Sequence, residues 1–368
     1  MYLILTQCFP SRIGGIENLV GNLSITLGDK EGQKVIVLAD RQHFLFDAIF
    51  DQENNKKIYI KRYGGIKFFR KRRKIDDLKF FIKSNEIKAI ITDTWKSLEL
   101  CIDEIHKNNI PTFCLAHGNE LLTKDDEKQK KISYIFNKVS SIIANSNYTA
   151  NLVKKFSGNN KKIKVIYPGA TDLRKITTTK EIKIKGNPII FTLARLEKRK
   201  GHLEVLKAIN KLRIIYPEIK YIIAGEGKEK KNLQNYVKKN QIDKNVDFVG
   251  AINDFTKKSI FSITNLLVMT TLDETKNQSI EGFGIVFIEA AFFGIPSITS
   301  NVGGTSEAVV HNETGIVLHN QDKLYENILE LFENKKKLNF LGNNAKIRAE
   351  KYFKWEIVIK KYLSEFKS

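Results

Sequence analysis

Short apolar runs alternate with longer segments of helical periodicity along the whole chain. In the first half, the runs that predict strands lie at Leu3–Thr6, Lys34–Ala39, Lys57–Lys61, Lys88–Thr92, Pro111–Ala116, Ser141–Ala144 and Lys164–Ile166. A second series begins at Pro188 and predicts strands at Ile189–Leu193, Tyr221–Ala224, Asp247–Val249, Leu266–Met269, Pro296–Thr299 and Gly315–Leu318. Because helical patterns separate these runs, we expect an α/β protein with parallel sheets and crossover helices.

The length also predicts two domains. A chain of 368 residues exceeds the size at which a single core usually keeps growing. The alternation breaks between Asp172 and Asn187, where three consecutive threonines and alternating lysines predict a linker. We therefore expect a first domain at 1–170, a linker at 171–187, a second domain at 188–345 and a terminal helical segment at 346–368.

Composition narrows the class of protein further. The cysteines Cys8, Cys101 and Cys114 lack zinc-type spacing, which predicts reduced thiols in a cytoplasmic protein rather than a disulfide framework. Met1–Thr6 is too short for a signal peptide, and no apolar run approaches the ~20 residues that span a bilayer, so we expect a soluble or peripheral protein. The net charge of +21 raises the question of nucleic-acid binding, but the excess is divided almost equally between the two halves.

One basic cluster differs from this even background, at Lys67–Lys74 (KFFRKRRK). It leads into a predicted helix in which Ile75, Leu78, Phe81 and Ile82 share one face. The pattern is compatible with two interpretations. The cluster forms either the solvated side of a Rossmann-type helix or a contact with anionic lipid at the inner face of the cytoplasmic membrane.

The most informative chemical pattern lies between Glu281 and Glu289, where two carboxylates bracket a glycine-rich turn that runs into an apolar helix. Backbone N–H groups at a helix N-terminus, left open by Gly282 and Gly284, can hold a diphosphate, and carboxylates accept hydrogen bonds from sugar hydroxyls. We place Glu281 in the turn and Glu289 about two turns into the helix. The pattern suits a sugar-nucleotide site.

Other candidate residues follow predicted strands, where ligands of open parallel sheets bind. Gly14 and Gly15 come after the first strand and can bring N–H groups close to a phosphate or a sugar ring. His117 ends a strand-like run. Arg195 and Lys200 follow the first strand of the second domain, where fixed cations can stabilise a departing diphosphate without a metal.

Three nearby predictions concern structure rather than chemistry. Lys198 and Arg199 are expected at the surface. Ser146 is expected to cap the helix that follows its strand. Trp95 is expected to be a packed aromatic residue.

The segment Glu281–Glu289 resembles the E-x7-E signature of the retaining GT-B glycosyltransferases, and of their family 4 in particular. The resemblance extends over nearly the whole chain, through Pro10–Glu17 (PSRIGGIE), His117-Gly118, Ala144–Thr149 (ANSNYT), Tyr167-Pro168-Gly169, Arg195–Gly201 (RLEKRKG), Gly225–Gly227 (GEG), Val249-Gly250, and Gly303-Gly304 with Glu307. It implies the GT-B fold, in which two doubly wound Rossmann-like domains face a cleft. A C-terminal helix, here within 346–368, then crosses back to the first domain.

The resemblance also implies a role for each site residue. The implied catalytic residues are His117, Arg195, Lys200 and Glu281, with Glu281 on the sugar hydroxyls and the two cations on the diphosphate. The implied donor-binding residues are Gly14, Gly15, Gly250, Phe283, Gly284, Ile285, Val286 and Glu289, with Gly250 beside the base and Glu289 on the ribose. Retaining members of the family are thought to use a front-face step in which the leaving phosphate takes the acceptor proton, so no side-chain base is expected. No D-x-D motif is present, and we expect neither a metal nor a cofactor.

Together these features predict a retaining glycosyltransferase that moves a hexose from a nucleoside-diphosphate sugar to a glycan or lipid-linked acceptor, in the assembly of envelope polysaccharide or lipopolysaccharide. No motif selects the donor base, the sugar or the acceptor. Two alternatives stay open: a sugar-nucleotide epimerase on the same scaffold, and a basic nucleic-acid-binding protein. The order and spacing of the motifs favour the transferase.

Overall fold

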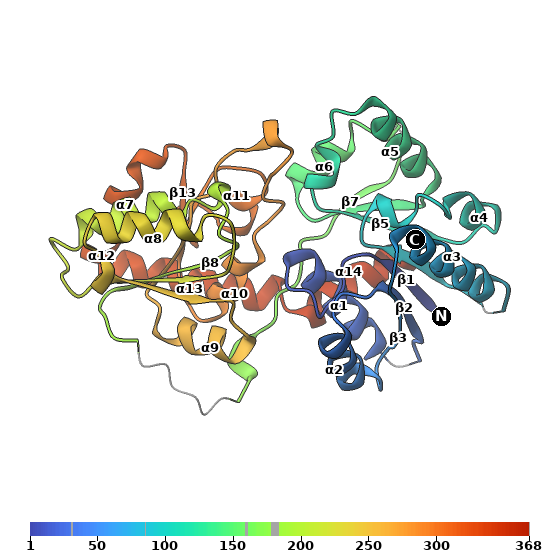
Figure 1. Cartoon of the computed structure of the whole chain (residues 1–368), viewed down its shortest axis with the longest axis horizontal. Coiled ribbons are helices and arrows are strands. Elements are labelled where there is room, and N and C mark those ends of the chain that lie inside the picture. Colours follow the sequence, from blue (N-terminus) through green and yellow to red (C-terminus); the bar gives the residue numbers. More distant parts are fainter. Residues whose placement is uncertain (31, 85, 159–160, 178–183, 368) are drawn as a thin grey trace. The chain divides into compact units, whose positions relative to one another are not determined.

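The computed structural model describes residues 1–30, 32–84, 86–158, 161–177 and 184–367, so part of the predicted linker at 171–187 lies outside the described residues. The chain forms two units (Figure 1). Unit 1 contains Met1–Gly169 and Trp355–Ser368, and unit 2 contains Ala170–Lys354. Each unit is built around a parallel β-sheet with helices on both faces, which confirms the predicted α/β architecture.

Unit 1 has a seven-stranded sheet in the order β3-β2-β1-β4-β5-β6-β7. Its strands are β1 (Tyr2–Thr6), β2 (Val35–Asp40), β3 (Tyr59–Tyr63), β4 (Ala89–Thr92), β5 (Thr112–Ala116), β6 (Ser141–Ala144) and β7 (Ile163–Val165). Its helices are α1 (Gly15–Gly28), α2 (Phe44–Asn54), α3 (Lys67–Ser84), α4 (Ile102–Lys107), α5 (Asp126–Lys138), α6 (Asn147–Val153) and α14 (Trp355–Lys367).

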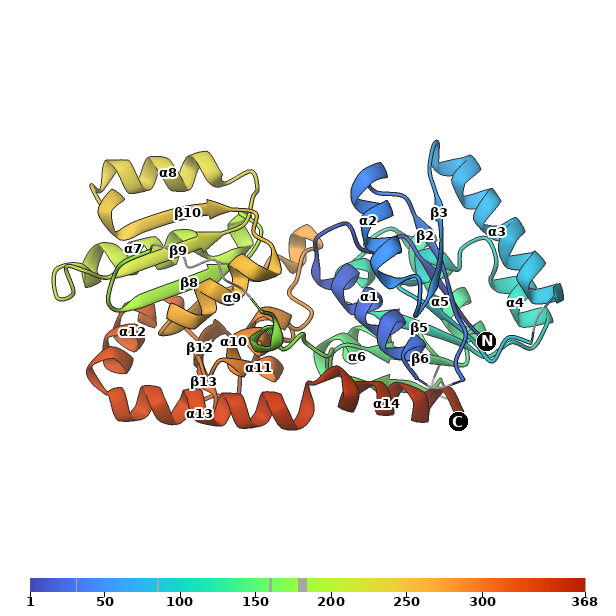
Figure 2. The same cartoon turned by 90° about the horizontal axis from the view of Figure 1, so that it is seen from below.

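The central strands of this sheet are apolar at successive positions because both faces are covered. Tyr2 and Ile4 of β1 pack in a core with α1 and α14, whereas Leu3 and Leu5 pack in a second core with α3, α4 and α5. Figure 2 shows α14 running along unit 1 below α1 and the sheet. Ser146 caps α6 by accepting a hydrogen bond from the Thr149 backbone N–H at 3.0 Å, as predicted.

Unit 2 has a six-stranded sheet in the order β10-β9-β8-β11-β12-β13. Its strands are β8 (Ile189–Leu193), β9 (Lys220–Ala224), β10 (Val246–Gly250), β11 (Leu266–Met269), β12 (Ser297–Ser300) and β13 (Gly315–Leu318). Its helices are α7 (His202–Leu212), α8 (Lys230–Lys239), α9 (Asp254–Ile263), α10 (Ile285–Phe292), α11 (Thr305–Ala308), α12 (Leu324–Glu333) and α13 (Lys335–Tyr352). All thirteen predicted strands are present, with ends that shift by one or two residues.

The terminal helical region is divided between the two units. Helix α13 packs on α10 in unit 2, whereas α14 packs on α1 in unit 1. The chain therefore changes unit between Lys354 and Trp355, and not at residue 346 where the predicted segment begins. The Ala170 N–H donates to the Phe353 carbonyl at 2.9 Å, and this bond belongs to unit 2.

Both sheets have a switch point, where the chain reverses the direction in which strands are added. In unit 1 the switch lies between β1 and β4, and in unit 2 it lies between β8 and β11. Crevices at the carboxyl ends of such strands are the usual ligand sites of open α/β sheets. None of the helices within the described ranges combines the length and the apolar content needed to cross a membrane.

Candidate active site

In unit 2, the loops at the carboxyl ends of β8, β9 and β11 meet through glycines. At Gly225, with φ of 135°, a Cβ would lie 2.0 Å from the Ala194 carbonyl oxygen after β8. At Gly201, with φ of 72°, a Cβ would lie 2.1 Å from the Thr270 carbonyl oxygen after β11. Only glycine permits this close approach and this backbone conformation, so Gly201 and Gly225 bring the loops after β8, β9 and β11 together at the switch point.

Two cations share one carboxylate at this point. Glu281 lies in the turn before α10, as predicted, and its Oε2 bonds the Nζ of Lys200 and lies 3.1 Å from Nη1 of Arg199. The side chains of Arg199 and Lys200 are only 4% and 10% exposed. Burial opposes ionisation of Glu281, but Lys200 and Arg199 outweigh it and lower the pKa of its carboxyl. Burial, with the charge of Arg199 nearby, lowers the pKa of Lys200.

The structure corrects the prediction for Arg199 and shows that Arg195 and Lys200 differ in exposure. Arg199 is buried and bonded to Glu281, so its predicted surface position was wrong. Arg195, predicted to act beside Lys200, has a side chain that is 64% exposed and pairs with Glu197 at 2.9 Å. The short 3₁₀ turn Lys198–Lys200 directs Arg199 and Lys200 inward while Lys198 stays exposed, and Arg195 lies outside this turn. The run of basic residues alone contained no signal that would have chosen Arg199.

Helix α10 begins directly after Gly284, which has φ of 92°. A Cβ there would lie 2.6 Å from the Phe287 ring, so the turn requires glycine. The N–H groups of Ile285 and Val286 occupy the first turn, where a helix supplies no acceptor of its own. The turn is also held from the other side, since the Gly304 N–H donates to the Glu281 carbonyl at 2.9 Å.

Glu289 is the fifth residue of α10, one turn into the helix rather than two, and it is buried. Its Oε1 lies 3.0 Å from Nζ of Lys257 on α9, and Lys257 also pairs with Asp254 at 3.0 Å. Burial opposes protonation of Lys257, but the two carboxylates outweigh it and raise the pKa of the lysine. Glu289 is therefore a buried and paired carboxylate.

The other predicted residues of unit 2 lie close to this region of the sheet. Gly250 ends β10 with φ of 70°, and its carbonyl accepts a hydrogen bond from the Gly225 N–H at 2.7 Å. Phe283 is buried, with its ring 5.9 Å from that of Phe353.

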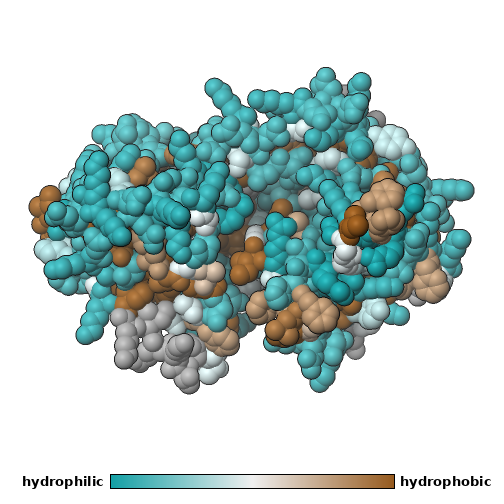
Figure 3. Space-filling view, viewed as in Figure 1, coloured by the Kyte–Doolittle hydropathy of each residue, from teal (hydrophilic) through white to brown (hydrophobic). Residues whose placement is uncertain are grey.

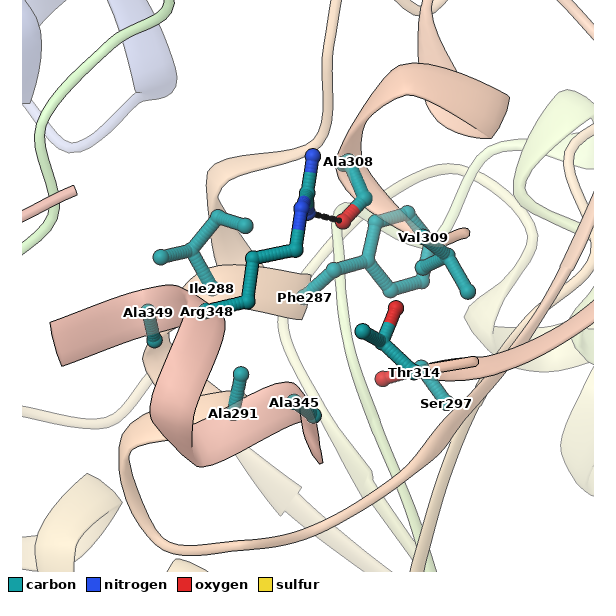
Figure 4. Close-up of a pocket in the computed structure, with 10 residues that line it drawn as sticks. All are labelled: Phe287, Ile288, Ala291, Ser297, Ala308, Val309, Thr314, Ala345, Arg348 and Ala349. Atoms are coloured by element: carbon teal, nitrogen blue, oxygen red, sulfur yellow. Dashed lines mark hydrogen bonds between the residues drawn. The ribbon is translucent and has the colours of Figure 1, made fainter. Parts of the chain in front are cut away.

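Behind α10 the packing leaves a void of about 10 Å³, lined by residues of α10, α11, β12 and α13 (Figure 4). Arg348 of α13 extends past this void and donates to the Ala308 carbonyl at 2.6 Å and to the Glu307 carbonyl at 2.7 Å. It thereby caps the C-terminus of α11. Because Gly304 lies at the other end of α11, this contact helps to hold the turn that carries Glu281.

In unit 1, a buried carboxylate joins the loops of the switch point. Oδ2 of Asp93 accepts hydrogen bonds from the N–H groups of Gln7 and Cys8 at 2.8 and 3.0 Å. The Asp93 carbonyl accepts a hydrogen bond from Nε2 of His117 at 2.8 Å, so the lone pair of the neutral ring lies on Nδ1. His117 is buried, and Trp95 is buried with its indole N–H on the Glu120 carbonyl at 3.1 Å, as a packed aromatic.

Gly14 precedes α1, and Gly15 is its first residue. A Cβ on Gly14 would lie 2.2 Å from Oε2 of the buried Glu17, whereas a Cβ on Gly15 would meet open space. Glu17 pairs with Arg12 at 3.0 Å. A carboxylate therefore already lies close to the first turn of α1.

Cys8, Cys101 and Cys114 are all free thiols. Burial raises the pKa of Cys8 and of Cys101 to about 12, so these thiols are poor nucleophiles. Within the ranges that the structure describes, no group of three or more His, Cys, Asp or Glu residues could hold a metal ion.

Sequence and structure comparisons now identify the class of protein. The model of the glycosyl transferases group 1 matches residues 174–348, and the model of glycosyltransferase family 4 matches residues 13–172. Together the two models account for most of both units. The chain is a member of the group 1, family 4 glycosyltransferases, and its two Rossmann-like units form the GT-B fold.

Individual relatives are distant but span the whole chain. A GDP-mannose-dependent monoacylated alpha-(1-6)-phosphatidylinositol monomannoside mannosyltransferase of Corynebacterium glutamicum is 23% identical over 97% of this chain and 95% of its own. An uncharacterised glycosyltransferase of Methanocaldococcus jannaschii is 26% identical over the same shares. The crystal structure of Anabaena HepE in complex with UDP and glucose has a TM-score of 0.80 and 19% identity, and covers 100% of this chain and 99% of that one. These matches favour a transferase over the epimerase alternative.

Proposed function

We propose that this glycosyltransferase moves a hexose from a nucleoside-diphosphate sugar to a glycan or lipid-linked acceptor, with retention of the anomeric configuration and without a metal ion. The proposal includes a role in the assembly of envelope polysaccharide or lipopolysaccharide. It also includes a cytoplasmic location with peripheral contact to the inner face of the membrane.

The cluster of Arg199, Lys200 and Glu281 beside the N-terminus of α10 carries the proposal. Three cations, Arg195, Arg199 and Lys200, pair with two carboxylates, Glu197 and Glu281, which leaves one positive charge unmatched. The first-turn N–H groups of Ile285 and Val286 add the positive end of the helix dipole. Both features favour an anion such as a diphosphate. The oxygens of Glu281 at the same place can accept hydrogen bonds from the neutral hydroxyls of a sugar.

In the proposed reaction, the bond between the anomeric carbon and the diphosphate oxygen breaks, and its electron pair leaves with the diphosphate. The acceptor oxygen attacks the same face of the anomeric carbon, and its proton passes to the departing diphosphate. Arg199 and Lys200 stabilise the negative charge that develops on the leaving group. The ion pair with Glu281 holds Lys200 in place, so the cation needs little rearrangement.

The roles proposed for unit 1 follow from its polar groups. Glu17 lies close to Gly14 and its charge is matched by Arg12, so we propose sugar or acceptor hydroxyls as the ligands of this turn. His117, with its Nε2–H directed to Asp93, offers Nδ1 as an acceptor for a hydroxyl. In unit 2, Arg195 is proposed as an exposed diphosphate contact, Glu289 and Lys257 as a ribose contact, and Gly250 as a neighbour of the base.

The test begins with the donor. The Corynebacterium relative is named for GDP-mannose and the Anabaena structure holds UDP, so GDP and UDP sugars lead a panel that also contains ADP and CMP compounds. A ligand that binds only the folded protein raises the melting temperature, by mass action. One nucleoside diphosphate should raise it selectively, and its sugar should be transferred to an acceptor found by screening glycans and lipid-linked saccharides.

Variants then test the site. Lys200→Ala should lower kcat by about 100-fold or more, since it removes one of the cations on the leaving group. Lys230→Ala is the matched control, because Lys230 lies in the same unit but pairs with Glu226 at the surface. Full turnover by Lys200→Ala would remove the site assignment. An inverted product anomer, or loss of turnover in EDTA, would remove the retaining or the metal-free part of the proposal.

A further inference from the structure

Helix α2 exposes four of its five large apolar residues, and only Phe50 packs on the core. A surface helix normally turns its apolar face inward. In α2, however, Phe44 is 78% exposed, Leu45 57%, Phe46 56% and Ile49 45%, while the one fully buried side chain is that of Asp47.

Asp47 fixes this orientation. Its Oδ1 accepts a hydrogen bond from the Ser11 hydroxyl at 2.7 Å and lies 3.1 Å from Nη1 of Arg62. Its Oδ2 accepts from the Gln42 N–H at 2.8 Å. Rotating α2 to bury Phe44 and Phe46 would break these contacts and expose the carboxylate. The exposed aromatic side is therefore built into the fold of unit 1 and is not the result of a loosely attached helix.

The neighbouring loops extend the same apolar surface. Strands β1, β2 and β3 are adjacent, so the loops at their carboxyl ends lie next to one another. Arg41 joins two of these loops, because its N–H donates to the Tyr63 carbonyl at 2.7 Å and its guanidinium lies 5.7 Å from the Phe44 ring. The α2–α3 surface comprises the exposed residues Ile13, Phe44, Leu45, Phe46, Ile49, Ile66, Phe68 and Phe69. Figure 3 shows apolar side chains gathered where Figure 1 places α2, on the face toward the viewer.

Only some of the basic residues in Lys67–Lys74 contribute an unpaired charge to this surface. Lys74 bonds Asp40 and Thr6 and is buried, and Arg70 pairs with Asp40 at 3.1 Å. Lys71 pairs with Glu99 at 2.6 Å. Half of the basic residues in Lys67–Lys74 are thus engaged by acids of unit 1.

Other basic side chains remain at the surface. In the described part of the chain, Lys67, Arg72 and Arg41 have no ion-pair partner, and all three are exposed. Arg72 lies 4.7 Å from the Phe68 ring and Arg41 lies over Phe44, so cations flank the exposed aromatics. The two acids closest to Arg41 in the sequence, Asp40 and Asp47, are buried and paired. Asp76, four residues after Arg72, is exposed, and Asp77 pairs with Lys61.

We propose that the α2–α3 surface docks on an anionic lipid bilayer. Exposed aromatic and aliphatic side chains flanked by Arg and Lys suit the boundary between headgroups and acyl chains. The basic residues match the negative surface potential of such a membrane, and exposed apolar residues that gather on neighbouring loops mark an interaction site. This inference extends the membrane contact in the proposed function to a defined surface. It can fail while the transferase assignment stands, because vesicle binding needs no turnover.

The experiment is co-sedimentation of the full chain with vesicles. Vesicles of phosphatidylcholine with about one third phosphatidylglycerol should bind the protein, and pure phosphatidylcholine should bind it about tenfold or more weakly. The double variant Phe44→Ser/Phe46→Ser should weaken binding to the anionic vesicles by about tenfold or more. Lys67→Gln/Arg72→Gln should weaken it by about tenfold and should reduce its dependence on salt.

The matched control is Ile214→Ser/Phe255→Ser, which removes apolar side chains that are 80% and 51% exposed in unit 2. It should bind vesicles like the wild type. Equal binding by the α2 variant, or no binding of the wild type to either vesicle, overturns the proposal. A dimer in light scattering that the α2 variant abolishes, without vesicle binding, assigns the surface to a second copy instead. Transfer to a soluble acceptor should be unchanged in all these variants.

Discussion

Replacing Glu281 by glutamine removes the negative charge that Arg199 and Lys200 share while keeping the size of the side chain. The three side chains are 16%, 4% and 10% exposed, in the order Glu281, Arg199 and Lys200, so water cannot substitute for the lost charge. Removing one partner of a buried ion pair costs about 3–5 kcal/mol. The amide oxygen of the introduced glutamine retains one hydrogen bond, so we expect Glu281→Gln to lower the free energy of unfolding by about 2–4 kcal/mol.

The effect of Glu281→Gln on the free energy of unfolding depends on pH. The pKa of Glu281 is lowered in the folded protein from its ordinary value of 4.5, because the two cations outweigh burial. The charged form therefore contributes stability above 4.5, and this contribution is lost as the pH falls through the folded-state pKa. The difference in the free energy of unfolding between wild type and Glu281→Gln should have its largest value at about pH 7 and should decrease in acid.

Urea unfolding followed by circular dichroism measures this difference. The control is Glu330→Gln, since Glu330 is 54% exposed and pairs with Lys337 at the surface of the same unit. It should change stability by about 0.2–1 kcal/mol. Diphosphate binding should survive in Glu281→Gln, because the site becomes more positive, while transfer should fall. Equal stability of Glu281→Gln and wild type at about pH 7 would refute the electrostatic account of the cluster.

Three further predictions concern the surroundings of the site. Gly284→Ala should weaken nucleoside-diphosphate binding about tenfold or more, because φ of 92° and the nearby Phe287 ring exclude a Cβ. Gly15→Ala should be tolerated, because a Cβ there meets open space. Titration calorimetry with the nucleoside diphosphate compares the two variants. His202 is buried without a hydrogen-bond partner for either ring nitrogen among the described residues, and burial lowers its pKa to about 4, so stability should fall as the pH drops from 6.5 toward 4. His202→Leu should reduce that loss by about 2 kcal/mol at about pH 5, as read from urea midpoints, and an unchanged pH profile would contradict the assignment. Arg348→Ala should lower the free energy of unfolding by about 2 kcal/mol in thermal unfolding, whereas the exposed Lys346→Ala should have little effect.

The membrane interpretation of the basic cluster shows how tertiary contacts change the meaning of a sequence pattern. In the sequence, Lys67–Lys74 forms one continuous positive segment. In the fold, Arg70 and Lys74 are directed to Asp40 at the end of a neighbouring strand, which leaves fewer charges at the surface. The apolar residues of α2 did not stand out in the sequence, because an apolar helix is normally taken to be buried.

The sequence by itself determined the strands, their parallel arrangement and the family. Apolar runs that alternate with helical segments favour a parallel sheet with helices on each side, so the local pattern sufficed. The turn of Glu281 before α10 was also readable, because glycine spacing and the start of an apolar helix are local features.

Only the tertiary structure decided which side chains meet at the switch point. Arg195 and Arg199 are both arginines after β8, yet Arg195 lies exposed and pairs with Glu197, whereas the 3₁₀ turn Lys198–Lys200 directs Arg199 to Glu281, more than 80 residues away. The same holds for Asp47, whose partners on three different segments hold α2 with Phe44 and Phe46 exposed. Such pairings depend on long-range contacts between charged groups, which the local periodicity of a chain does not encode.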